Sequence, residues 1–414
     1  MQPVKLTIHG EFWDSHIYSS QLHLFGMDSS VTTIDWNRLV SSLNVGDDLV
    51  FALQCAFTNS EWLYGPKFKI LFRDREIRDL IRSKFDRLSA ISLTADRNLL
   101  ANSRVKKHAF NHPFPFTDLT IYKQHVYSSS LEGICFDRLT AGKRIPLSNN
   151  PNRLWDCPTL SIAASFSNLA TATGTEGLHK VPLYGEDGLH STREKAQMLA
   201  DEDCVHCNWL ETGIYGSSHT GRSCFADFEV EARRVSEKSN GDIQRAMLAD
   251  TYTGTGDHID SPYSRTKLNL KNTIYSDKIF EHIGYSWGSY DKLYLTHKNK
   301  IKVVKVQSRT IRRDLDFHAI EDVGINLKFG NVVSGAVAPF GTVIECDEGI
   351  VLLNSDGIVS EFAGEPVRYR VFNRSRHYEN QLHIIYDDRI EIYSFNGDYF
   401  VDQSKKVFGY TAFV

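Results

Sequence analysis

The sequence has no apolar run approaching the roughly 18 residues that a membrane-spanning helix needs. Its first residues, MQPVKLTIHG, also lack an apolar core of the length found in secretory signal peptides. The formal net charge is −4, so the chain has no overall positive field of the kind that nucleic-acid binders carry. These absences argue against a membrane protein. Binding of nucleic acid would have to rely on a local basic patch.

Cysteine is sparse and unevenly placed. The seven copies form an odd number and are scattered along the chain, at Cys55, Cys135, Cys157, Cys204, Cys207, Cys224 and Cys346. Small secreted disulfide frameworks usually carry an even number of closely spaced cysteines in a short chain. We therefore expect reduced thiols and a cytoplasmic protein.

Aromatic residues, in contrast, are abundant. Phe with 24 copies and Tyr with 18 supply most of the 12% aromatic content, and flat rings pack well on pleated sheets. Hydrophobic residues at 41% and charged residues at 24% are typical of a folded globular chain. The composition thus favours a globular protein built mainly from strands.

Short apolar runs separated by turn signals fill most of the chain. Near its end, QLHIIY (381–386) and RIEIYSF (389–395) follow each other across a tight turn. Strands joined so closely pair antiparallel, because parallel strands need long crossovers. Helical patterns are few, at 74–85, 190–203 and 240–250. The pattern predicts an all-β fold with a few short helices in the loops between strands.

A tetrapeptide recurs three times at nearly regular spacing. Trp36-Asn37-Arg38-Leu39 is followed 49 residues later by Phe85-Asp86-Arg87-Leu88, and 51 residues after that by Phe136-Asp137-Arg138-Leu139. Upstream, residues 16–39 align with residues 120–139, and both segments begin near an Ile-Tyr pair. A period of about 50 residues is typical of propeller blades. We interpret Trp36, Arg38, Phe85, Arg87, Phe136 and Arg138 as a structural repeat in which the aromatic residue and the leucine are buried; a ring of arginine anion sites is the alternative.

In this pattern of repeated strand–turn–strand units, the chain resembles the β-propeller superfamily, which includes the WD-repeat and kelch-like families. The Gly-His, Trp-Asp and double-glycine blade signatures of those families are missing. The resemblance implies a single closed propeller, best divided into seven four-stranded blades. The expected blades are 1–45, 46–95, 115–148, 150–200, 201–275, 280–340 and 341–414. VKLTIHG (4–10) is expected to pair with DYFVDQ or KVFGYTAFV near the C-terminus and close the last blade.

One set of residues has the spacing of a structural zinc site. Cys204 and Cys207 form a CxxC, and His219 and Cys224 follow at intervals that fall within the loose range for zinc. The alternative is that the cysteines are packed as small apolar core residues. No cofactor other than this possible zinc is indicated.

Residues 297–313 form a basic stretch. Its charges are Lys298, Lys300, Lys302, Lys305, Arg309, Arg312 and Arg313, and SRVKKH (103–108) is a second, smaller cluster. Lysines along a strand can protect a sheet edge from aggregation. They can equally bind phosphates or an acidic partner.

Three functions follow from a propeller with these features. The first is a non-catalytic scaffold or recognition subunit that binds a protein partner through its rim or top-face loops, within a multiprotein assembly such as a microbial regulatory or defence complex. It should show an exposed apolar or aromatic patch. The second is a hydrolase or lyase, which should show His, Asp and Arg side chains at one mouth of the central channel. The third is a nucleic-acid-binding subunit, which requires both basic stretches on one face.

Overall fold

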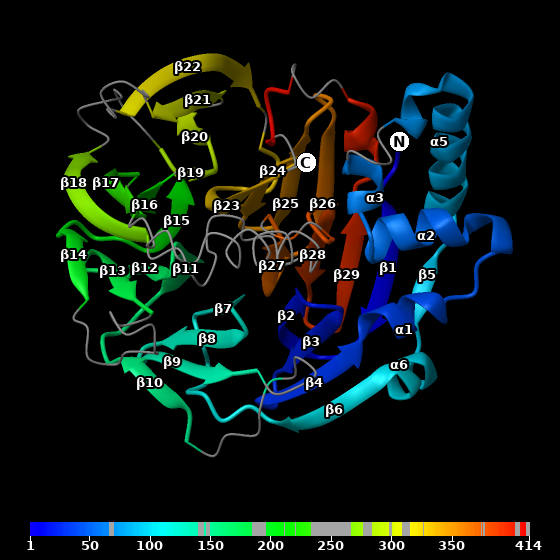
Figure 1. The fold of residues 1–414 in the computed structure, drawn as a ribbon, viewed down its shortest axis with the longest axis horizontal. Helices are drawn as coiled ribbons and strands as arrows, with labels where there is room; N and C mark the ends of the chain where they lie inside the picture. The colour runs from blue at the N-terminus through cyan, green and yellow to red at the C-terminus, as the bar shows by residue number, and fades with distance from the viewer. Residues whose placement is uncertain are drawn as a thin grey trace, which may run out of the picture.

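The computed structural model describes residues 1–65, 70–139, 145, 150–183, 196–210, 212–219, 221–232, 266–275, 284–297, 300–308, 315–325, 327–373, 375, 377–401 and 406–410. The strands form seven sheets, antiparallel except for one pair, arranged around one axis as a β-propeller (Figure 1). The predicted all-β propeller with seven blades is therefore confirmed. None of the described helices is long and apolar enough to cross a bilayer.

The blades are numbered in chain order. Blade 1 consists of β2 (Phe12–Tyr18), β3 (Gln21–Gly26), β4 (Ser30–Asp35) and β6 (Arg104–Ala109). Blade 2 consists of β7 (Asp118–Tyr122), β8 (His125–Ser130), β9 (Gly133–Arg138) and β10 (Asn152–Trp155). Blade 3 consists of β11 (Ser161–Ser165), β12 (Asn168–Ala172), β13 (Leu178–Pro182) and β14 (Gln197–Ala200).

Blade 4 consists of β15 (His206–Leu210), β16 (Gly213–Ser217), β17 (Ser223–Ala232) and β18 (Thr266–Tyr275). Blade 5 consists of β19 (Ser286–Ser289), β20 (Lys292–His297), β21 (Lys300–Ser308) and β22 (Leu315–Gly324). Blade 6 consists of β23 (Val332–Ala338), β24 (Gly341–Cys346), β25 (Gly349–Asn354) and β26 (Val359–Ala363). Blade 7 contains β27 (Arg368–Val371), β28 (Gln381–Ile385) and β29 (Arg389–Ser394) together with β1 (Val4–His9) and β5 (Leu93–Ala95).

The first strand of each blade lies next to the axis. These inner strands, β2, β7, β11, β15, β19, β23 and β27, each approach the inner strands of the two neighbouring blades. Apolar side chains between the blades form the core, because each sheet buries both faces against its neighbours. The seven inner strands start at the same end of the ring, and we call that end the entry face.

The N-terminal strand closes the ring. β1 pairs antiparallel with β29, from Val4 opposite Ser394 to His9 opposite Arg389. The N-terminal strand thus belongs to the last blade, but the partner segments suggested by the sequence were wrong. DYFVDQ contains the 3₁₀ helix η5 (Gly397–Phe400), and the described part of KVFGYTAFV is not a strand.

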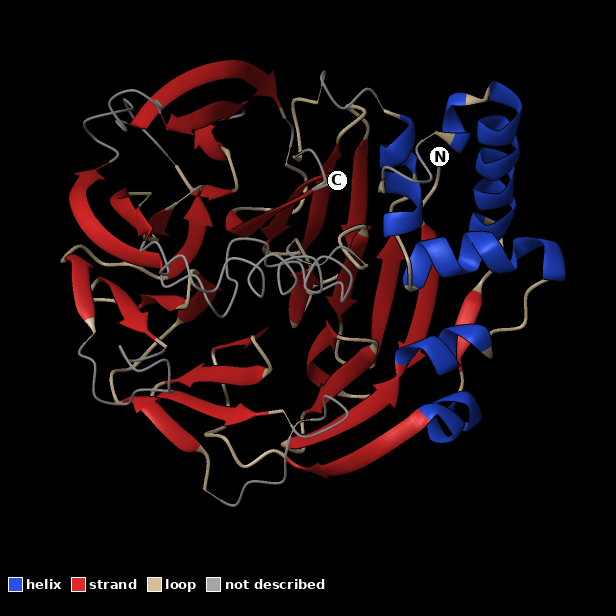
Figure 2. Ribbon diagram, viewed as in Figure 1, coloured by secondary structure: helices blue, strands red, loops and turns tan. Residues whose placement is uncertain are grey.

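A helical insertion replaces the blade expected at 46–95. It occupies the connection between β4 and β6 of blade 1, and the helices gather on one side of the ring (Figure 2). It contains α1 (Trp36–Ser41), η1 (Asp47–Leu49), α2 (Val50–Phe57), α3 (Glu61–Tyr64), η2 (Leu71–Arg73), α5 (Arg75–Ser89) and α6 (Arg97–Ser103). Its strand β5 pairs parallel with β1, so the insertion of blade 1 reaches across to blade 7.

Three other sequence expectations need correction. The range 280–340 ends inside blade 6, and 341–414 combines the rest of blade 6 with blade 7. The sequence analysis predicted one blade too many at 46–95 and one too few over 341–414, so the predicted total was still seven. The helix expected over 190–203 is contradicted at its end, where β14 forms instead.

The tetrapeptides do not mark equivalent positions. Trp36 begins helix α1, Phe85 lies in the C-terminal half of α5, and Phe136 lies in strand β9. The backbone N–H of Trp36 donates to the carbonyl of Ser20, whereas the same bond in blade 2 runs from Leu139 to Gln124. Trp36 therefore corresponds to Leu139, and the two tetrapeptides are three residues out of register. Their aromatic and leucine side chains are nevertheless buried, as expected.

The Ile-Tyr pairs upstream do mark equivalent positions. Tyr18 ends β2 and Tyr122 ends β7, and each precedes a two-residue turn with both residues at positive φ. The phenol oxygen of Tyr18 accepts a bond from the Gln124 N–H in the next blade, and Tyr122 accepts one from the Ser167 N–H, both at 3.2 Å. These tyrosines link blade 1 to a turn of blade 2, and blade 2 to a turn of blade 3.

Side chains of blade 7 donate hydrogen bonds to the last carbonyls of helix α2. The last carbonyls of a helix lack partners within the helix. Here the Ala56 carbonyl accepts from Ser394 Oγ at 2.7 Å and from Asn380 Nδ2 at 3.1 Å, and the Phe57 carbonyl accepts from Gln381 Nε2 at 2.8 Å. All three side chains are buried. The insertion is thereby fixed to the closing blade.

We predict that Asn380→Ala destabilises the protein by about 2–3 kcal/mol, because it removes a buried amide that donates to the Ala56 carbonyl and to Asn396 Oδ1, each at 3.1 Å. Urea unfolding followed by tryptophan fluorescence measures the change. Asn331→Ala is the matched control, since the exposed Asn331 bonds only to Asp347 at the surface. Equal effects of the two substitutions would contradict the proposed role of Asn380.

Candidate functional site

The four residues with zinc-like spacing do not form a metal site. Cys204, Cys207 and Cys224 are buried in one apolar cluster between blades 3 and 4, while His219 is exposed in the turn after β16. The Cys207 thiol donates to the Ser161 carbonyl at 3.5 Å, and burial raises the pKa of the Cys224 thiol to about 12. No three His, Cys, Asp or Glu side chains of the described residues are placed to hold a metal ion. The cysteines are core residues.

The described residues of the two basic stretches lie on opposite sides of the ring. Lys298, Arg309, Arg312 and Arg313 lie outside the described residues. Lys300, Lys302 and Lys305 lie on β21, which is paired on both sides and is not an edge strand. The second cluster lies on β6, the outer strand of blade 1, on the opposite side of the ring (Figure 1). The arrangement required for the nucleic-acid alternative is therefore missing from the described residues.

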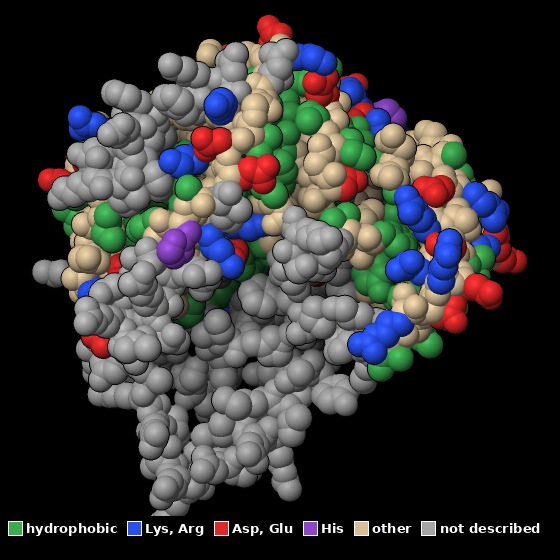
Figure 3. Space-filling model, turned by 90° about the horizontal axis from the view of Figure 1, so that it is seen from above, with side chains coloured by type: hydrophobic (Ala, Val, Ile, Leu, Met, Phe, Trp, Pro, Cys, Tyr) green, Lys and Arg blue, Asp and Glu red, His purple; other side chains and the backbone are tan. Residues whose placement is uncertain are grey.

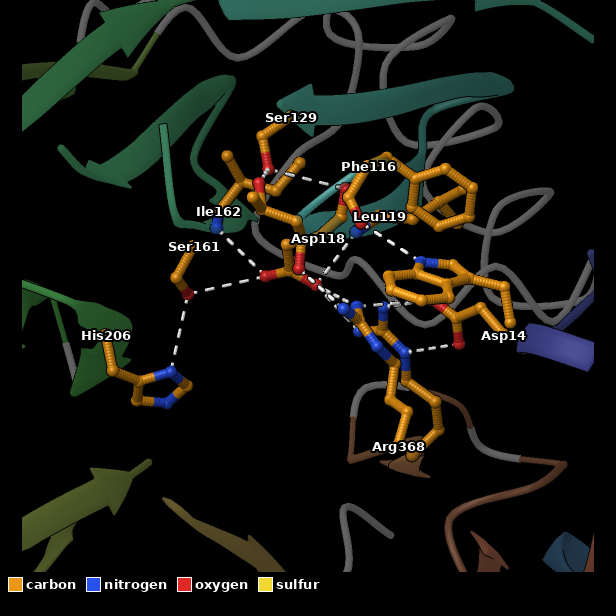
Figure 4. A network of polar contacts seen from close by, with 12 residues as sticks. Asp14, Phe116, Asp118, Leu119, Ser129, Ser161, Ile162, His206 and Arg368 are labelled. Carbon is orange, nitrogen blue, oxygen red and sulfur yellow. Dashed lines mark hydrogen bonds and ion pairs between the residues drawn. The ribbon is translucent and has the colours of Figure 1, made fainter. Parts of the chain in front are cut away.

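A cluster of four charged side chains lies at the axis, near the entry face (Figure 4). We call Asp14 of β2, Asp118 of β7, and Arg368 and Arg370 of β27 the axial cluster. Arg370 donates to both carboxylate oxygens of Asp14, at 2.9 and 2.5 Å, and its Nη1 lies 2.9 Å from Asp118. Arg368 lies 3.5 Å from Asp14 and 3.7 Å from Asp118. Blades 7, 1 and 2 are thus joined by ion pairs.

The axial cluster neutralises itself. Burial alone would raise the pKa of Asp14, but the charges of Arg370 and Arg368 outweigh it and hold the pKa below the usual range. Burial would likewise lower the pKa of Arg370, yet Asp14 and Asp118 raise it. Asp14 is completely buried, whereas Arg368 and Arg370 remain 19% and 17% exposed at the axis. Asp14 and Arg370 are therefore both charged at neutral pH.

The network continues into blades 3 and 4. Asp118 Oδ2 accepts from Ser161 Oγ at 3.3 Å and from the Ile162 N–H at 3.0 Å. Ser161 Oγ also lies 3.4 Å from Nδ1 of His206, the first residue of β15. Burial lowers the pKa of His206, so its imidazole is neutral at pH 7.

The order of these groups does not match a hydrolase triad. In a triad the histidine lies between the serine and the carboxylate. Here Ser161 lies between Asp118 and His206, and both carboxylates of the axial cluster are already engaged by arginines. His, Asp and Arg do meet at one end of the axis, as the enzyme alternative required. The pairing of these groups joins the blades to one another; it does not activate a nucleophile in the manner of a triad.

Aromatic side chains border the axial cluster on the entry face. The indole N–H of Trp13 donates to the Phe116 carbonyl at 3.0 Å, and the Arg368 guanidinium lies 5.9 Å from the Trp13 ring. Phe114 contacts Trp13 edge to face, with ring centroids 5.4 Å apart, and is 38% exposed. An aromatic pair beside a partly exposed arginine is a composition favoured at protein interfaces.

Three histidines of blades 1 and 7 are held in the neutral form. Burial lowers the pKa of His16 to about 4, with Arg370 adding to the shift and Asp14 and Asp118 opposing it. Burial lowers the pKa of His23 to about 3, and His16 and His108 act in the same direction. Burial also lowers the pKa of His383 to about 3; His16 adds to this shift and Asp14 opposes it. All three imidazoles are therefore neutral at pH 7.

Sequence reasoning did not identify the axial cluster. The sequence analysis singled out neither the two arginines of VRYRVF nor Asp14. A signal was available, because arginines two residues apart on one strand point to the same face and need countercharges. The positions of those countercharges could not be inferred, since Asp14 is separated from Arg370 by 356 residues.

Comparison with known proteins adds similarities of fold. No family model and no curated protein matches the chain. Its structure is similar to the WD40 domain of Neurospora crassa Pan2, with a TM-score of 0.45 and 8% identity over 93% of this chain and 89% of that one. It is similar to a putative 6-phosphogluconolactonase from Bacteroides uniformis, with a TM-score of 0.38 and 10% identity over 68% and 80% of the two chains. At these identities neither transfers an activity or a partner.

We predict that Arg370→Met costs about 3–5 kcal/mol, because it leaves the fully buried Asp14 without its main countercharge. The double variant Asp14→Asn/Arg370→Met should lose less than the sum of the single losses. Denaturant unfolding measures both quantities. Lys107→Met, which breaks an exposed pair with Asp28, is the control and should change stability by no more than about 1 kcal/mol. Strict additivity of the first two substitutions would contradict the ion-pair assignment.

We predict a loss of stability between pH 7 and pH 5. The folded pKa values of His16, His23 and His383 lie below the ordinary value of 6.5, so the unfolded chain binds more protons in this range. The effect is about 2 kcal/mol per histidine at pH 5. His23→Gln should reduce the pH dependence, whereas His9→Gln, at an exposed position, should not. An unchanged pH dependence in His23→Gln, measured by urea unfolding at both pH values, would show that His23 is not held neutral.

Proposed function

We propose that this chain is a non-catalytic recognition subunit that binds a partner protein on the entry face. The observation that carries the proposal is the pair Trp13 and Phe114 beside Arg368. Trp13 is fixed by its hydrogen bond and by the arginine, so a partner would meet a preordered surface at a small entropic cost.

Other features of the entry face support the same proposal. Leu131, in the turn between β8 and β9, and Val333, near the start of β23, are exposed apolar side chains on this face. The axial cluster joins blades 7, 1 and 2 underneath, so the face is held by ion pairs rather than by loops alone. The cytoplasmic location expected from the sequence remains a prediction.

The proposal is tested by affinity purification from the native host with quantitative mass spectrometry. Phe114→Glu should reduce the capture of at least one stoichiometric partner more than tenfold, because a charge replaces an aromatic anchor. Ile358→Glu is the matched control: Ile358 is 55% exposed in the turn between β25 and β26, on the opposite face.

Two results would contradict the proposal. One is capture of the same partners by wild type and by Phe114→Glu in equal amounts. The other is the absence of any stoichiometric partner of the wild type. Thermal unfolding midpoints of the two variants, compared with wild type, show that the Phe114→Glu effect does not arise from unfolding.

A further inference from the structure

The connections on the entry face carry an excess of acidic side chains. These connections are the turns between the second and third strands of each blade and the segments that lead from one blade to the next. Among their described residues, twelve acidic side chains are exposed but only two basic ones, Arg222 and Lys328. At the opposite end of the ring, outside the helical insertion, the described connections expose one acidic side chain, Asp356. On the edge of the ring, Lys and Arg side chains lie among Asp and Glu side chains (Figure 3).

Two pairs of neighbouring connections hold half of these exposed acidic residues. In blade 7 the Gly10 N–H donates to the Asp388 carbonyl at 2.9 Å, and in blade 6 the Gly364 N–H donates to the Glu348 carbonyl at 3.1 Å. The turn of each of these blades thus lies against the segment that leads into the next inner strand. We call the exposed acidic residues of these connections the acidic rim: Asp347, Glu348, Glu365, Asp387, Asp388 and Glu11.

The acidic rim borders the aromatic pair of the entry face. Glu11 precedes Trp13 by two residues, and Glu365 precedes Arg368 by three. The Arg368 guanidinium in turn lies 5.9 Å from the Trp13 ring, and Phe114 packs on the same ring. A partner that covers Trp13 and Phe114 therefore meets the acidic rim at one side of its footprint.

The charge of the acidic rim is mostly uncompensated within the described part of the chain. Of its six members only Asp388 makes an ion pair, with Arg389 at 2.8 Å. Lys328, in the segment before β23, pairs instead with Glu361 outside the rim. The arginines of the axial cluster are engaged by its aspartates, and no three described carboxylates converge to hold a metal ion. The missing positive charge would have to come from a binding partner.

We propose that the partner bound on the entry face presents a Lys- or Arg-rich segment to the acidic rim. The proposal rests on the proposed function of this face and specifies the chemistry of its partner. Basic side chains of the partner would lie beside the rim carboxylates, while neighbouring apolar side chains would cover Trp13 and Phe114. The negative face also attracts a basic partner at long range and repels the phosphates of nucleic acids. A second copy of this chain fits less well, because a two-fold contact would bring two acidic rims together.

The test uses the full-length chain with photoreactive p-benzoyl-phenylalanine in place of Phe114, which keeps an aromatic ring at that position, irradiated in extract of the native host. Mass spectrometry identifies the attached peptide, which should belong to another protein and carry more Lys and Arg than Asp and Glu. Glu11→Lys/Glu365→Lys should lower the yield at least tenfold. Glu76→Lys/Asp86→Lys, which makes the same change of charge at exposed positions of α5, should leave the yield unchanged.

Salt supplies a second readout. Raising the salt concentration from about 0.05 M to about 0.5 M should lower the yield when the acidic rim is intact, and should affect Glu11→Lys/Glu365→Lys much less. Thermal unfolding midpoints of both double variants show that a loss of yield does not arise from unfolding.

The outcomes separate this proposal from the proposed function. Attachment to an acidic or uncharged segment of another protein, equal yields from the two double variants, or a yield independent of salt would overturn the basic partner and leave recognition on the entry face standing. Attachment to a second copy of this chain, or no attachment at all, would overturn the proposal and count against the proposed function as well.

Discussion

Four charges at the axis must balance one another, and the closure of the ring depends on that balance. Arg368 and Arg370 come from the last blade, whereas Asp14 and Asp118 come from the first two. The two ends of the chain are therefore joined at three distances from the axis. Ion pairs join them at the centre, and the pairing of β1 with β29 joins them further out. At the outside they are joined by the pairing of β5 with β1 and by the hydrogen bonds from blade 7 to the end of α2. Burying a charge of this cluster without its partner would lower the stability of the fold, so the arginines and the aspartates each depend on the other.

This construction also shapes the surface of the ring. The entry face presents Trp13 and Phe114 above the axial cluster, because the start of β2 and the segment before β7 are drawn together there. On the outside of the ring, the N-terminal half of α5 leaves Ile77 and Leu80 exposed. The entry face is preordered by its hydrogen bond and ring contacts, which lowers the entropic cost of binding a partner.

The sequence reveals what is encoded locally. Alternating apolar residues predicted the hairpins, and the Ile-Tyr pairs at 17–18 and 121–122 marked equivalent strand ends. The tetrapeptide was a misleading signal, because the same four-residue pattern occurs in different structures. Phe85 lies in the helix α5, whose N-cap is Asp74, whereas Phe136 lies in a strand. The axial cluster was hidden because folding brings its members together across more than 350 residues.

Native-state hydrogen exchange followed by mass spectrometry tests most directly whether the seam is locked. Amides of β1, β28 and β29 should be protected as strongly as those of β11 to β13, on the far side of the ring, because all then open only by global unfolding. Markedly faster exchange in β1 and β29 alone would show that the seam opens locally. In that case the axial ion pairs and the anchored insertion would not be what holds the propeller closed.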